Sequence, residues 1–185
     1  MNILAKLHAK RLHKQKGYTL IELSIAGAII ALLIYGTVKL VNGVIADHRA
    51  NSELQELPTI IAKIQKVYGN RPSFTGATQA ILVNSGAFPA DWVVTGSTNL
   101  VNRWSGTVTL AVATIGAVPN NAISLDTSGV PNSECSSVVP GMDDSVRTTT
   151  VNGTPIKQDG QPSDLAALGT ACTNTTNEIV YTFSK

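Results

Sequence analysis

The sequence predicts an α+β fold in which one long N-terminal α-helix packs on an antiparallel β-sheet. Two observations support this. Residues 18–68 follow one continuous helical pattern, and the residues after them alternate short β-prone runs with Gly, Pro and Asn. A chain of 185 residues is long enough for one globular domain with an appendage. We therefore expect the apolar first half of the helix to protrude and the second half to join the domain.

The first 17 residues are basic. They hold five Lys and Arg and no acid, whereas the rest of the chain holds nine basic and twelve acidic residues, a net charge of −3. The overall charge of +2 therefore comes from this segment, and we expect no specific nucleic-acid partner. A positive block before an apolar run is typical of a membrane orientation signal. We interpret residues 1–17 as a leader peptide that is removed.

Residues 18–46 are strongly apolar. Their uncharged centre, Leu23 to Val38, is sixteen residues long and would span about 24 Å as a helix. With Tyr18 to Ile21 it is long enough to cross a bilayer. We therefore expect a transmembrane segment that also serves in assembly.

Residues 47–68 continue the helix with an amphipathic pattern. The charged residues here, Glu53 and Glu56 among them, lie mostly off the apolar stripe. The stripe should therefore enter the core, and Gly69 should end the helix. Its members recur at intervals of three and four residues: Leu54, Leu57, Ile61, Ile64 and Tyr68.

Residues 69–185 are expected to form a globular head. Short helices are predicted over residues 77–84 and near the cysteines, over 133–139 and 164–168. Asn152-Gly153 is typical of a two-residue hairpin turn. The antiparallel sheet should comprise strands over residues 107–114, 122–125, 145–151 and 178–183.

The two cysteines, Cys135 and Cys172, lie in a region rich in Ser, Thr and Asn. Neither belongs to a CxxC motif or adjoins a His, so we expect no metal site. Downstream of a targeting segment they favour a disulfide, with two free thiols as the alternative. GxSxG, Walker and HExxH motifs are missing from the sequence, so we expect neither an enzyme nor a cofactor.

The junction of leader and apolar run reads KGYTLIEL over residues 16–23. Here the sequence resembles the type IV pilins, whose prepilin peptidase cuts after a Gly, methylates the new N-terminus and favours Glu at the fifth mature position. The resemblance implies cleavage between Gly17 and Tyr18, N-methylation of Tyr18 and an assembly role for Glu22. It also implies a pilin-like α/β roll with a C-terminal disulfide loop.

Glu22 needs a partner on physical grounds. A carboxylate within an apolar helix costs roughly 2.5 to 3.5 kcal/mol on insertion scales. No Lys or Arg lies three or four residues away. Cleavage creates an α-amino group at Tyr18, which can pair with Glu22 of a neighbouring subunit. The alternative is that Glu22 lies at the membrane surface, favoured by the helix N-terminus.

The resemblance implies a type IVb major pilin, most similar to the PilS-type pilins of thin conjugative pili. Its partners would be copies of itself, the prepilin peptidase and the pilus assembly machinery. It would first cross the inner membrane once, with its N-terminus in the cytoplasm, and then form an extracellular fibre for adhesion, aggregation or mating contact. Alternatives are a type II secretion pseudopilin, a minor pilin, a periplasmic protein cut after Ala46, and an unprocessed membrane protein.

Overall fold

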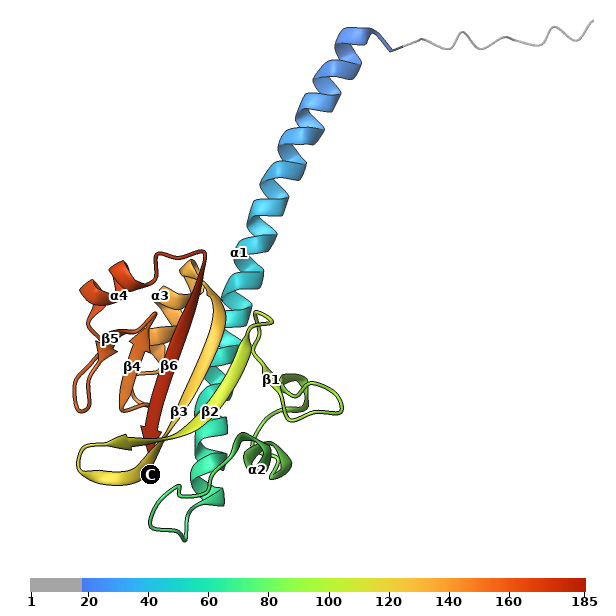
Figure 1. Cartoon of the computed structure of the whole chain (residues 1–185). Coiled ribbons are helices and arrows are strands. Elements are labelled where there is room, and N and C mark those ends of the chain that lie inside the picture. The colour runs from blue at the N-terminus through green and yellow to red at the C-terminus, as the bar shows by residue number, and fades with distance from the viewer. Residues whose placement is uncertain (1–17) are drawn as a thin grey trace, which may run out of the picture. The chain divides into compact units, whose positions relative to one another are not determined.

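The structure is a computed structural model that describes residues 18–185 (Figure 1). The expected leader, residues 1–17, and with it Gly17, lies outside the described residues. By internal contacts the chain divides into two units, one up to Asn42 and one from Gly43 to Lys185. We call residues 43–185 the head; they include the last part of α1 as well as the globular region expected over residues 69–185. The long helix α1, Leu20–Val67, runs through both units and ends two residues before Gly69.

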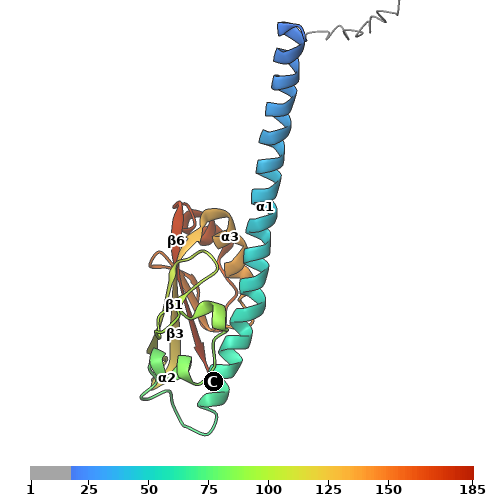
Figure 2. The same cartoon turned by 90° about the vertical axis from the view of Figure 1, so that its right-hand side faces the viewer.

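The head contains a six-stranded antiparallel sheet with the strand order β1-β2-β3-β6-β4-β5 (Figure 1). β3 and β6 lie at its centre, and the second half of α1 covers one face (Figure 2). The expected antiparallel sheet is thus confirmed. The strands are β1 Leu100–Val101, β2 Thr107–Ile115, β3 Val118–Pro131, β4 Thr148–Val151, β5 Thr154–Lys157 and β6 Thr176–Ser184.

Short helices fill the connections. They are α2 Gln79–Asn84, the 3-10 turn Ala90–Trp92, α3 Asn132–Gly141 and α4 Leu165–Ala171. α3 packs so closely on α1 that a Cβ added at Gly141 would lie 2.6 Å from Leu54 Cδ2. The helices expected at residues 77–84, 133–139 and 164–168 are therefore confirmed as elements, with shifted ends.

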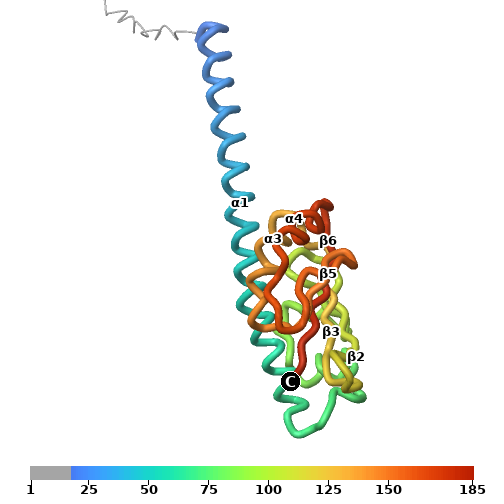
Figure 3. Tube along the Cα trace, turned by 90° about the vertical axis from the view of Figure 1, so that its left-hand side faces the viewer, coloured from blue at the N-terminus to red at the C-terminus, as the bar shows by residue number. Residues whose placement is uncertain are grey.

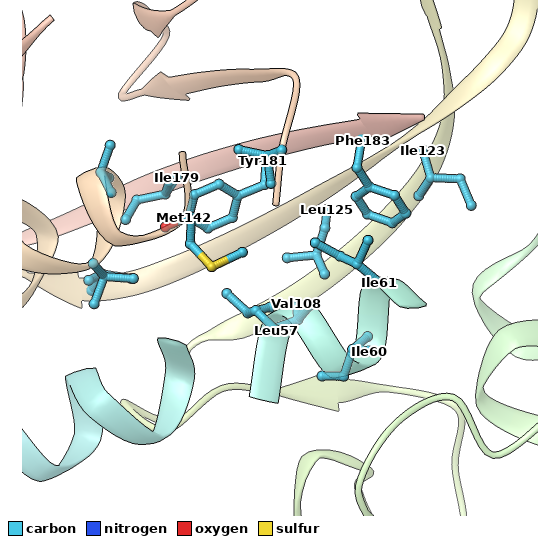
Figure 4. Close-up of a cluster of buried hydrophobic side chains, with 14 of the residues drawn as sticks. Leu57, Ile60, Ile61, Val108, Ile123, Leu125, Met142, Ile179, Tyr181 and Phe183 are labelled. Atoms are coloured by element: carbon cyan, nitrogen blue, oxygen red, sulfur yellow. The ribbon is translucent and has the colours of Figure 1, made fainter. Parts of the chain in front are cut away.

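The core lies between α1 and the sheet. Figure 4 shows Leu57 and Ile61 of α1 pointing toward Leu125 of β3 and Phe183 of β6. All four side chains are almost fully buried. The predicted apolar stripe is confirmed, because four of its five members are buried and Leu54 packs against the core half-exposed.

The prediction for β3 was too short. Residues 122–125 were expected, but the strand extends over Val118–Pro131. Its extra residues include Pro119, Asp126 and Gly129, which are uncommon inside strands. β3 is paired on both sides, with β2 and with β6, so long-range hydrogen bonds outweigh its weak local preference. β1 and the 3-10 turn were not predicted.

Glu53 corrects the expectation that the charged residues lie off the stripe. Its side chain is fully buried, and neither carboxylate oxygen has a hydrogen-bond partner. Position 53 precedes Leu57 by four residues and therefore shares its helix face. Burial raises the pKa of the Glu53 carboxyl from 4.5 to about 8; Glu56 also raises this pKa, and Arg103 lowers it.

We predict that Glu53 makes the head more stable in acid. The unfolded chain loses this proton near pH 4.5 and the folded chain only near pH 8, so in that window the free energy of unfolding falls as pH rises, by about 1.4 kcal/mol per pH unit. Glu53→Gln should remove this contribution and stabilise the protein by about 3 kcal/mol at pH 7.

The measurement compares urea unfolding of the purified chain in detergent, followed by tryptophan fluorescence, between pH 4.5 and 8. Other titrating groups, such as Asp126, are common to both proteins and cancel in the difference. Glu56→Gln is the matched control: Glu56 pairs with Arg103 and accepts a hydrogen bond from Trp92, so its loss should destabilise at pH 7. Parallel pH profiles for Glu53→Gln and wild type would contradict the prediction.

A disulfide joins Cys135 of α3 to Cys172, which follows α4. The Cα atoms are 5.9 Å apart, within the usual range for a disulfide, and both residues are almost fully buried. The expected disulfide is confirmed, and the alternative of two free thiols is wrong. The bond closes a segment that contains the β4–β5 hairpin.

Replacing both cysteines with Ala should lower the free energy of unfolding by about 4 kcal/mol, because the bond restricts a long loop in the unfolded chain. Urea unfolding of the purified chain measures this effect, with reduced wild type as the control that should match the double variant. Thiol labelling of denatured, unreduced protein should find no reactive thiol. Two reactive thiols per chain would contradict the bond.

Candidate processing and assembly site

The N-terminal end of α1 holds the described part of the KGYTLIEL motif, residues 18–23. Thr19 directly precedes the first helical residue, and its Oγ1 accepts a hydrogen bond from the Glu22 amide at 3.2 Å. Its carbonyl accepts another from the Leu23 amide at 3.1 Å. Thr19 is therefore the N-cap and Glu22 the third helical residue, which is the spacing of a capping box. Thr19 was not predicted as a cap, although Thr-x-x-Glu is the sequence signal for one.

Glu22 and Tyr18 are both exposed, Tyr18 by 82%. Within residues 18–185 Glu22 takes part in no ion pair. Its position in the first turn of α1 is favourable for a carboxylate, by about 0.3 to 1 kcal/mol through the helix dipole. The carboxylate is thus placed by its own helix but not neutralised by the rest of the described chain.

The apolar segment, which we define as residues 18–45, has every residue exposed. Its only charges are Glu22 and Lys39, and the Lys39 ammonium lies 5.4 Å from the centre of the Tyr35 ring. By length and composition α1 is able to cross a membrane, with a mean hydropathy of 2.0 over its most apolar window. So much apolar surface indicates contact with lipid or with other protein.

Three glycines of α1 have no packing role within residues 18–185. A Cβ added at Gly27, Gly36 or Gly43 would meet no atom within 4 Å outside the local helix backbone. Small residues on an apolar helix allow another helix to approach closely. These glycines therefore suit helix–helix contact between chains.

A cluster of charged side chains in the head has a structural role. Arg103 pairs with Glu56 of α1 and, at 2.6 Å, with Asp91. Trp92 Nε1 donates a hydrogen bond to Glu56 at 2.7 Å. This network fastens the loops around β1 to α1. Residues 18–185 contain no group of three or more His, Cys, Asp or Glu placed to hold a metal ion.

Comparison with known proteins gives a family. The sequence profile of the PilS N-terminal family matches residues 47–184. A type IVb pilin from Salmonella typhi shares the fold, with a TM-score of 0.60 and 22% identity over 73% of this chain and 99% of that chain. TcpA, a type IV pilin from Vibrio cholerae El Tor biotype, has a TM-score of 0.56 and 12% identity over 74% and 99%. Curated proteins gave no match.

The head contains the sheet, the disulfide and the amphipathic half of α1, and the profile covers nearly all of it. The expected pilin-like fold is confirmed. The chain belongs to the PilS N-terminal family, and its fold is that of the type IVb pilins.

Proposed function

We propose that this chain is the structural subunit, a major pilin, of a type IVb pilus. The proposal rests on the apolar segment. Every residue from Tyr18 to Ile45 is exposed, and residues 47–184 of the same chain match a pilin family. Burying an apolar side chain is worth about 1.5 to 3 kcal/mol. Outside the membrane, packing among identical segments keeps these side chains out of water and therefore holds the fibre together.

Processing precedes assembly in this proposal. The prepilin peptidase cuts between Gly17 and Tyr18 and methylates the Tyr18 amine, and the KGYTLIEL motif supports this. Before assembly the subunit crosses the inner membrane once, with its N-terminus in the cytoplasm. The membrane-embedded assembly machinery then moves it into an extracellular fibre that serves adhesion, aggregation or conjugative mating contact.

Glu22 sets the register of the incoming subunit in this mechanism. Its carboxylate lies in the first turn of α1, one turn from Tyr18. In a bundle of apolar helices, the Tyr18 amine of one subunit meets Glu22 of the next and each neutralises the other. A misaligned subunit leaves two charges in apolar surroundings, which costs several kcal/mol. The competing role is capping alone, in which Glu22 needs only its hydrogen-bonding capacity.

Cleavage after Gly17 is tested by intact-mass analysis of the mature protein. It should contain 185 less 17 residues, or 168, and begin with N-methylated Tyr18. Gly17→Trp should block processing because the side chain is bulky, whereas Gly17→Ala, the matched control, adds one methyl group and should still be cut in part. A mature N-terminus at Met1 or at Asp47 would refute this step.

Variants of Glu22 separate charge pairing from capping. Glu22→Gln keeps the capping capacity but loses the charge. Pairing predicts that sheared fibre falls more than tenfold while mature, membrane-bound subunit stays at the wild-type level, because a buried amine loses its counter-charge. Thr19→Ala, which removes the observed cap but no charge, should reduce fibre much less. Wild-type fibre yield from Glu22→Gln, together with a loss from Thr19→Ala, would support capping and exclude pairing.

A further inference from the structure

Lys39 is the one charged residue in the sequence between positions 23 and 46. Its side chain is exposed and joins no ion pair within residues 18–185. No residue three or four positions away, the spacing at which helical side chains meet, is charged. The nearby Tyr35 ring attracts the ammonium but does not neutralise it. The described chain thus offers this cation no counter-charge.

The surroundings of Lys39 change when the proposed fibre forms. In a membrane, the flexible stem of a lysine lets its ammonium reach the lipid headgroups. In a bundle of apolar segments the headgroups are gone, and the ammonium lies among the apolar side chains of neighbouring helices. A charge in such surroundings is costly unless an opposite charge is close. Assembly therefore requires an acid beside Lys39.

Asp47 is the acid of α1 that is free to serve. It is exposed, and it belongs to no ion pair of the described residues. Of the other acids of this helix, Glu53 is fully buried in the head, Glu56 is paired within it, and Glu22 already meets an amine in the proposed mechanism. Asp47 also directly follows the apolar segment, where a carboxylate can remain hydrated until it pairs.

Lys39 and Asp47 of one chain are too far apart to pair. Both lie on one continuous helix, whose trace Figure 3 shows as an unbroken coil. They are eight positions apart, which is a rise of about 12 Å. The two residues can meet only between two chains, when one chain is displaced along the helix axis toward its own N-terminus. The long lysine stem reduces the displacement that is needed.

The pair proposed at the start of α1 requires displacement in the same direction. There too the acid, Glu22, follows the cation, the Tyr18 amine, by four positions or about 6 Å of helix. A stagger between about 6 and 12 Å therefore brings both acids near their cations. Glu22 and Asp47 are 25 positions apart, close to seven turns of 3.6 residues, so they lie on the same helix face. Tyr18 and Lys39, 21 positions apart, are close to six turns apart.

We propose that Lys39 of one copy pairs with Asp47 of the next copy in the fibre. Because the two residues differ, the contact is heterologous and repeats in one direction, which produces an open fibre and not a closed dimer. The pair adds a second charged contact near the other end of the apolar segment from Glu22, so a copy that slips by one turn loses both. The inference rests on the proposed function and names a contact that specifies its register.

Neutral variants test the pair in cells that produce the full chain. Asp47→Asn should lower sheared fibre at least tenfold, because the Lys39 ammonium is then enclosed without a counter-charge. Mature, disulfide-bonded subunit in the membrane should stay at the wild-type level. Adding Lys39→Gln removes that ammonium and should return fibre to within about threefold of wild type. Asp47→Glu keeps the charge and should retain most of the fibre.

Arg49→Gln is the matched control. Arg49 is exposed, carries a charge two positions from Asp47 and lies beyond the apolar segment, so its loss should leave fibre unchanged. Wild-type fibre yield from Asp47→Asn would overturn the pair. Failure of the double neutral variant to recover would also overturn it, because Asp47 would then serve a partner other than Lys39.

A crosslink tests the contact without relying on fibre yield. Lys39→Cys with Asp47→Cys should give a ladder of covalent oligomers in oxidised fibres, and either change alone should give none. The native cysteines are already joined to each other and do not interfere. Fibres of the double cysteine variant without a ladder would contradict the pair. Wild-type cells that accumulate mature subunit but form no fibre would instead refute the proposed function.

Discussion

The fold depends on the burial of one face of α1 against the sheet. Leu57 and Ile61 fill the space over Leu125 and Phe183, so the helix supplies one of the two layers of the core. A sheet with one apolar face must bury that face against another element, and an isolated amphipathic helix is only marginally stable in water. The same helix continues as the apolar segment, for which the described chain provides no cover. One helix thus has two apolar surfaces, of which folding buries only one.

The parts of the structure that were predictable are those that short sequence patterns encode. The interval of three and four residues between apolar side chains placed the core face of α1, and the Asn152-Gly153 turn placed the β4–β5 hairpin. The KGYTLIEL motif, on which the proposed processing rests, is likewise a short stretch of sequence. The position of Glu53 was predicted wrongly because the pattern of apolar residues alone places every carboxylate in solvent. Its burial follows from helix geometry, which puts residue 53 on the same face as Leu57.

Other features were not predictable because they join distant residues. Asn102 Nδ2 donates hydrogen bonds to Thr127 Oγ1 at 2.7 Å and to the Ser128 carbonyl at 2.6 Å, across the irregular part of β3. A Cβ at Gly106 would lie 1.8 Å from that carbonyl, so the turn requires glycine. Likewise, Lys185 Nζ donates a hydrogen bond to the carbonyl of Arg71, which is 114 positions away in the sequence. Local propensity contains no information about such pairs.

Apolar packing and charge contribute differently to the proposed fibre. The free energy of burying the apolar segment depends on area and scarcely on direction, so a helix that slides along its neighbours by one turn loses little of it. A misplaced charge costs several kcal/mol and therefore distinguishes neighbouring registers. Glu22, in the first turn of α1, provides such a point on the helix. Apolar packing then supplies most of the affinity, while the charge pair of Glu22 and the Tyr18 amine selects a single arrangement of subunits.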